Sequence, residues 1–87
     1  MNIKILGPGC HKCHELDKRT REVVNELGLD ASVEYIQDLN KIIEYAILTT
    51  PGLVVNGQLV CSGRVPTKAE ISKFITTALE KEGKSAN

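Results

Sequence analysis

The chain has 87 residues, a formal net charge of zero, 41% hydrophobic residues and 25% charged residues. This length predicts one small domain, and the balanced charge gives no indication of nucleic acid or an anionic membrane as a partner. No apolar run approaches the roughly 20 residues of a membrane-spanning helix, and the first residues do not resemble a signal peptide. We expect a cytoplasmic protein that is a monomer.

The first 36 residues predict a strand–helix–strand unit. An apolar run at 2–6 indicates a strand, which a segment of glycine and proline ends. Apolar residues then recur at helical spacing over 10–27, and Gly28 is a suitable helix stop. A second strand is expected over 32–36. Two strands joined by a helix normally lie parallel, so we expect a parallel pair.

A second helix is predicted after this strand. Asp38 or Asn40 can act as its N-cap, because a side-chain oxygen there accepts a bond from a free N–H of the first turn. Pro51 favours extended backbone at the residue before it and so ends the helix. The apolar residues at helical spacing are Leu39, Ile42, Ile43, Ala46 and Ile47.

A hairpin and a third helix complete the chain. Asn56-Gly57, between the apolar runs 53–55 and 58–61, is the preferred two-residue hairpin turn. A capping box at 67–70 opens a last helix, which we expect to end at Gly83.

The order of these elements is β-α-β-α-β-β-α. A parallel pair followed by a hairpin predicts an α/β fold with a mixed four-stranded sheet, and its apolar strands need helices on both faces. We expect one domain over residues 1–83 and a disordered polar tail over 84–87.

Cys10 and Cys13 lie at the junction of the first strand and the first helix. The N-terminus of a helix carries roughly +0.5 elementary charge, which favours a thiolate at Cys10. Cys13 follows one turn later on the same face, so the two sulfurs can form a disulfide. The spacing indicates dithiol–disulfide exchange, in which Cys10 attacks and Cys13 resolves the mixed disulfide. No bound cofactor is expected for this reaction.

A metal or metalloid carrier is the alternative function for Cys10 and Cys13. Together with His11 and His14 they offer four soft ligands within five residues. Neighbouring helical residues point about 100° apart, however, so the four side chains cannot face one ion. Because no second ligand cluster follows in the sequence, we expect no metal site.

Three basic residues could tune the pKa of the cysteines. His11 and Lys12 lie between them, where the charge of Lys12, or of His11 when protonated, favours a thiolate. Lys4 could stabilise a Cys13 thiolate if its side chain reaches that sulfur. The third cysteine, Cys61, is expected to pack as a small hydrophobic residue.

Cys-x-x-Cys after the first strand and Thr-Pro before the third resemble the minimal thioredoxin fold. Further motifs run across nearly the whole chain and are similar to those of small prokaryotic thioredoxin-like proteins, often called redox-active disulfide protein 2, in the thioredoxin-like glutaredoxin family. These motifs are Gly-x-Gly-Cys-x-x-Cys at 7–13, Tyr45, Thr-Pro-Gly-Leu-Val-Val-Asn-Gly at 50–57, and Gly-Arg-Val-Pro at 63–66.

The resemblance implies a protein-disulfide reductase that acts on protein or small disulfide substrates and is recycled by an upstream reductase. It also implies a cis-proline at Pro51 and pairing of the Thr50 backbone with an extended substrate segment. Two departures stand out. Larger thioredoxins carry a buried acid where this chain has Lys4, and the acidic residue with which glutaredoxins bind glutathione is missing after Gly63.

Overall fold

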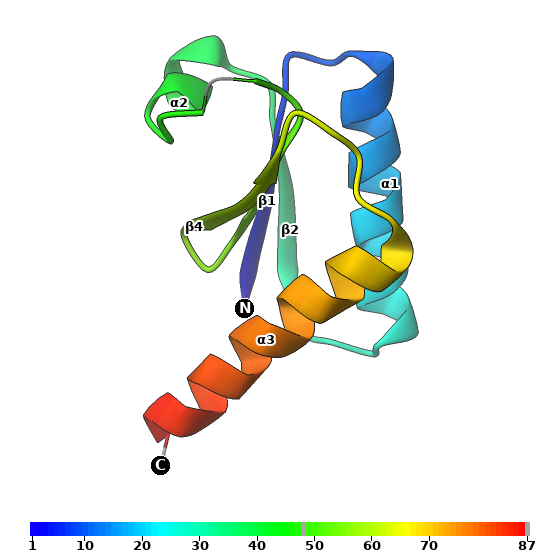
Figure 1. Cartoon of the computed structure of the whole chain (residues 1–87), viewed down its shortest axis with the longest axis vertical. Helices are drawn as coiled ribbons and strands as arrows, with labels where there is room; N and C mark the ends of the chain where they lie inside the picture. Colours follow the sequence, from blue (N-terminus) through cyan, green and yellow to red (C-terminus); the bar gives the residue numbers. More distant parts are fainter. Residues whose placement is uncertain (48, 87) are drawn as a thin grey trace.

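A four-stranded sheet with the strand order β2-β1-β3-β4 forms the centre of the molecule (Figure 1). The structure is a computed structural model that describes residues 1–47 and 49–86, with side chains up to residue 81. The predicted α/β fold with a mixed sheet is confirmed. The elements are β1 (Asn2–Leu6), α1 (His11–Glu26), β2 (Ser32–Ile36), α2 (Leu39–Ile43), β3 (Gly52–Val55), β4 (Gln58–Ser62) and α3 (Lys68–Ala86).

The register of β1 fixes which residues meet at the centre of the sheet. Ile5 lies opposite Tyr35 of the parallel strand β2 and opposite Leu53 of the antiparallel strand β3. β3 and β4 form the predicted hairpin, in which Asn56 and Gly57 have φ values of 51° and 80°. This left-handed backbone at both turn residues is what a two-residue hairpin requires.

Helices cover both faces of the sheet, as the apolar strands predict (Figure 1). α1 and α3 lie side by side over one face, and α2 lies over the other. Alternate residues of β1 point to opposite faces, so Ile3 and Ile5 belong to one apolar cluster and Leu6 to the other. The cluster under α1 and α3 comprises Ile3, Ile5, Leu16, Val23, Val24, Leu53, Val55, Ile71 and Ile75. The smaller one comprises Leu6, Ile36, Ile42 and Val54.

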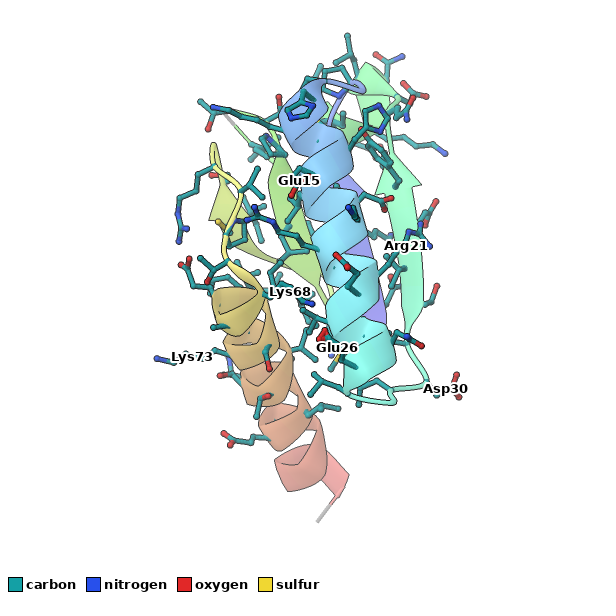
Figure 2. The ribbon with its side chains drawn as sticks, turned by 90° about the vertical axis from the view of Figure 1, so that its right-hand side faces the viewer. Glu15, Arg21, Glu26, Asp30, Lys68 and Lys73 are labelled. Atoms are coloured by element: carbon teal, nitrogen blue, oxygen red, sulfur yellow. The ribbon has the colours of Figure 1, made fainter. Side chains whose placement is uncertain are left out.

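An ion pair joins the two helices on the first face. Nζ of Lys68 on α3 lies 2.6 Å from Oε2 of Glu26 on α1, and Figure 2 shows the two residues next to each other. Both side chains are about half exposed, so water screens the pair and it contributes little to stability. The buried apolar side chains therefore hold α3 against α1.

The helix α2 is much shorter than its apolar spacing predicts. It ends at Ile43, and Ala46 has a left-handed φ of 54° that turns the chain back toward the sheet. Ile42 is buried, whereas Leu39 and Ile43 are 60% and 69% exposed. The predicted N-cap is confirmed, because Oδ1 of Asp38 accepts a bond from Asn40 N–H at 2.9 Å. The predicted helical face through Ile47 is wrong, since the chain must reverse before it enters β3.

The helix α3 is longer than predicted. It continues through Gly83 to Ala86, so the predicted stop at Gly83 is wrong. The predicted disordered tail is helical as far as Ala86, and Asn87 lies outside the described residues. A glycine inside a helix costs only about 1 kcal/mol relative to alanine, so it need not end one. None of the helices that the structure describes combines the length and the apolar character needed to cross a membrane.

Candidate active site

Cys10 lies at the N-cap of α1, as predicted. Its backbone is extended, with φ −73° and ψ 168°, and its side chain is exposed. Sγ of Cys10 accepts a hydrogen bond from the backbone N–H of Cys13 at 3.3 Å. The sulfur thus occupies the place of a capping oxygen, where the free N–H groups of the helix favour a negative charge.

Cys13 is fully buried in the first turn of α1. Its sulfur lies against Gly7, the first residue after β1. A Cβ atom on Gly7 would lie 2.9 Å from Cβ of Cys13 and closer still to its Sγ. Only a glycine therefore leaves space for the buried thiol at the end of β1.

The two thiols differ in pKa as well as in exposure. The pKa of Cys10 is lowered by its hydrogen bond with the Cys13 side chain and then by the backbone N–H of Cys13. Burial raises the pKa of Cys13, and the hydrogen bond with Cys10 raises it further. Cys10 is thus the more exposed thiol, and its lowered pKa agrees with the thiolate that the helix N-terminus is expected to favour there.

Pro51 borders the same end of the sheet. The Thr50–Pro51 peptide bond is cis, as predicted. Pro51 is buried and Thr50 is exposed. Because Leu6 pairs with Gly52, the residues that flank this pair, Gly7 and Pro51, lie at the same edge of neighbouring strands. The buried proline and the buried thiol of Cys13 thus share this edge.

The remaining residues of the motif do not converge on the sulfurs. His11 and Lys12 are exposed on the first turn of α1. His14 packs against the ring of Tyr35 instead, with ring centroids 5.5 Å apart at an angle of 81°. Within the described part of the chain, no three His, Cys, Asp or Glu side chains come together in a way that could hold a metal ion.

Comparisons with known proteins identify the family. A family model described as a thioredoxin domain matches residues 1–76. A protein named thioredoxin from Methanothermobacter thermautotrophicus is 45% identical over 76 residues, which cover 87% of this chain and 99% of that protein. The chain belongs to the thioredoxin family. Another thioredoxin, from Methanocaldococcus jannaschii, is 35% identical over 78 residues, which cover 90% of each chain.

Membership of the thioredoxin family agrees with the chemistry of the site. This thioredoxin-family chain is a thiol–disulfide oxidoreductase. Its Cys-x-x-Cys motif presents one exposed thiol of lowered pKa and one buried thiol of raised pKa. An exposed thiolate is the form that attacks a disulfide, so the geometry fits the activity.

Lys4 points away from the cysteines in this thioredoxin-family fold. Its Nζ donates a hydrogen bond to Oη of Tyr45 at 3.1 Å and lies 5.9 Å from the centroid of that ring. This bond raises the pKa of Lys4, which keeps its ammonium charged. Lys4 alternates with Ile3 and Ile5 along β1 and so lies on the face covered by α2, whereas Cys13 lies on the face covered by α1. The structure therefore pairs Lys4 with Tyr45 and does not bring it to the sulfur of Cys13.

Tyr35 is a residue of the site that the sequence motifs do not reveal. Its hydroxyl oxygen is buried and has no hydrogen-bond partner among the described residues. Burial, followed by the Cys13 and Cys10 thiols, raises its pKa to about 12. The sequence offers one signal for Tyr35. Side chains alternate between the two faces along β2, which places Val33 and Tyr35 on the face toward α1. Only the register with β1 shows that position 35 lies near Cys13.

Cys61 lies apart from the dithiol motif. It is half-buried in β4 and packs against the larger apolar cluster, which confirms the expected role as a small hydrophobic residue. It pairs with Leu53 across the hairpin. Cys61 therefore offers a natural control for experiments on Cys10 and Cys13.

Proposed function

We propose that this chain reduces disulfides of protein and small-molecule substrates, with Cys10 as the attacking thiolate and Cys13 as the resolving thiol. One observation carries the assignment of roles. Cys10 is exposed and its pKa is lowered by hydrogen bonds to Cys13, whereas Cys13 is buried and its pKa is raised. A substrate disulfide can reach only the first sulfur, and only that sulfur is readily ionised.

The exchange proceeds in two steps. The Cys10 thiolate attacks one sulfur of the substrate disulfide, and the other substrate sulfur leaves as a thiolate that takes a proton from water. Cys13 then loses its proton and attacks Sγ of Cys10, which releases the second substrate thiolate and forms the Cys10–Cys13 disulfide. Two electrons pass to the substrate. An upstream reductase then supplies two further electrons, which reduce the Cys10–Cys13 disulfide and restore both thiols.

The segment at Thr50 and Pro51 is proposed to orient the substrate. Pro51 shares the sheet edge with Gly7, against which the Cys13 sulfur packs, and Thr50 is exposed beside it. An extended substrate segment can bind there through its main chain, as an added strand does. This binding mode requires a disulfide in an accessible, extended part of a partner protein.

We further propose that the protein works in the cytoplasm as a monomer, without nucleic acid or membrane as a partner. Its odd number of cysteines, three, does not suit a structural disulfide framework, and proteins of a reducing compartment rarely have such a framework. The zero net charge provides no long-range attraction for polyanions. The exposed Lys12 on the first turn of α1 adds a positive charge near Cys10, which favours a thiolate there.

Single cysteine variants test the assignment. We expect Cys10→Ser to abolish reduction of a disulfide peptide. With Cys13→Ser, we expect the reaction to stop after one equivalent of mixed disulfide has formed on Cys10. Mass spectrometry can detect this mixed disulfide. Cys61→Ser is the matched control and should retain the activity of the unchanged protein. Retained turnover in Cys10→Ser, or first labelling of Cys13 by a limiting alkylating reagent, would contradict the proposed roles.

A further inference from the structure

Tyr35 places a buried hydroxyl group under the first two turns of α1. Tyr35 pairs with Ile5 in the parallel β1–β2 ladder, and its ring packs edge-on against His14. The hydroxyl is shielded from solvent and has no partner at full hydrogen-bond distance among the described residues. A buried hydroxyl without such a partner is unfavourable, and, after burial itself, the Cys13 side chain is the neighbouring group whose hydrogen bonding with it raises its pKa.

The sulfur of Cys13 is the polar atom that the fold brings to this hydroxyl. Gly7 is two residues beyond Ile5 on the same face of β1, and its N–H continues the ladder to the carbonyl of Ile36 at 3.0 Å. Because the Cys13 sulfur lies on Gly7, the sulfur and the Tyr35 ring cover neighbouring positions under α1. The Cys13 thiol is also among the groups that raise the pKa of Tyr35, after burial, so the phenol keeps its proton at neutral pH.

We propose that the Tyr35 hydroxyl donates a hydrogen bond to Sγ of Cys13 when this sulfur becomes a thiolate, and that it thereby speeds resolution of the mixed disulfide. This inference rests on the proposed roles of Cys10 and Cys13. The Cys13 proton passes to water, and Tyr35 retains its own proton throughout. When the Cys13 thiolate attacks Sγ of Cys10, the Cys10–substrate bond breaks and the substrate leaves as a thiolate. The charge on Cys13 then disappears, and the hydrogen bond weakens.

Other charged groups near Cys13 are engaged elsewhere. The Asp17 carboxylate, one turn after Cys13, accepts a bond from Arg21 at 2.9 Å, and Arg21 also donates to the carbonyl of Val33 on β2. Figure 2 shows Arg21 on the side of α1 that faces β2. His14 is exposed and packs on Tyr35, and Lys4 bonds to Tyr45 on the opposite face of the sheet. Tyr35 is thus the donor that β2 supplies to the resolving sulfur.

The test is a rapid-mixing experiment on the full chain with a symmetrical aromatic disulfide whose thiolate absorbs light. The first equivalent of thiolate reports attack by Cys10, and the second reports resolution by Cys13. In Tyr35→Phe we expect the first phase to be unchanged and the second to slow about tenfold at neutral pH, because one unit of pKa corresponds to a factor of ten. The midpoint of the pH profile of the second phase should move upward.

Tyr45→Phe is the matched control, since it removes the other phenolic hydroxyl, on the opposite face. Its second phase should equal that of the unchanged protein. An unchanged rate and pH profile of the second phase in Tyr35→Phe would overturn the inference, as would equal slowing of both phases, which indicates a structural defect. Absence of the first phase in the unchanged protein would instead refute the proposed role of Cys10.

Discussion

At the scale of single residues, the site depends on the contrast between two thiols one helical turn apart. Cys10 caps α1 and is exposed, whereas Cys13 is enclosed between α1 and the end of β1. Gly7 creates the space for the buried sulfur, because any side chain at this position would overlap it. A residue outside the Cys-x-x-Cys spacing therefore decides whether the Cys13 thiol can be buried.

We predict that Gly7→Ala destabilises the reduced protein by about 1–3 kcal/mol, the usual cost of forcing extra atoms into a packed core. The cost is steric, since Gly7 is not among the glycines with left-handed backbone. Denaturant unfolding under reducing conditions measures it. In a Cys13→Ala background the contact with Sγ is absent, so the same substitution should cost less. Equal losses in the two backgrounds would contradict the proposed contact.

At the scale of elements, α3 begins with a capping box that also holds the preceding loop. Thr67 N–H donates to Oε1 of Glu70 at 3.1 Å, and Glu70 N–H donates to Oγ1 of Thr67 at 3.2 Å. Arg64 contacts both carboxylate oxygens of Glu70, at 3.2 and 2.7 Å. The predicted capping box is confirmed, and Arg64 extends it to the loop after β4.

This arrangement predicts a specific sensitivity to acid. Arg64, followed by the backbone N–H of Thr67, lowers the pKa of Glu70 to about 2. A carboxyl group with a depressed pKa in the folded state stabilises the fold above its unfolded pKa, near 4.3, and loses this contribution as the pH falls toward 2. We expect the stability advantage of the unchanged protein over Glu70→Gln to shrink between about pH 4.5 and 2.

Denaturant unfolding at several pH values, for both proteins, tests this expectation. Glu80→Gln, at an exposed position later in α3, is the control and should follow the unchanged protein across the range. A constant difference between the unchanged protein and Glu70→Gln over this range would show that the carboxylate does not stabilise the start of α3.

The elements also show where sequence patterns suffice. β1, α1 and the hairpin were predicted correctly because their apolar residues are buried on the faces that the spacing indicates. The predicted length of α2 is wrong because Leu39 and Ile43 fit a helical face but remain exposed. Local spacing also does not show that the chain must turn back to β3. The predicted end of α3 at Gly83 is wrong because glycine permits a helix to stop but does not require it.

Some features of the candidate site can also be predicted from the sequence, and others require the structure. Cys10 and Cys13 lie close together in the sequence, so local rules predict the position of Cys10 at the start of α1, whereas the cis bond at Pro51 follows from the resemblance to thioredoxin-like proteins. The environment of Cys13 also depends on β2. The parallel register that pairs Ile5 with Tyr35 places this strand near Cys13. Neither the pairing of Lys4 with Tyr45 nor the buried Tyr35 hydroxyl follows from spacing along the chain.

At the scale of the whole molecule, one apolar cluster unites both ends of the chain with the sheet. Met1 packs against this cluster from one terminus, and α3 contributes Ile71 and Ile75 from the other. Among the residues with described side chains, Leu79 is the last of α3 to join the cluster. The match to the thioredoxin domain family likewise covers residues 1–76. The stability of the domain should therefore depend on α3 up to about this point.

We predict that a chain ending at residue 81 keeps its disulfide reductase activity and a free energy of unfolding within about 0.5 kcal/mol of that of the full chain, because Leu79 is the last residue with a described side chain that joins the apolar cluster. Ile75→Ala in the full chain should cost about 2–5 kcal/mol, since Ile75 is completely buried and its loss leaves a cavity. Denaturant unfolding of the three proteins measures both effects. If removing residues 82–87 were as damaging as Ile75→Ala, the last turn of α3 would belong to the folded core, and the domain could not end before it.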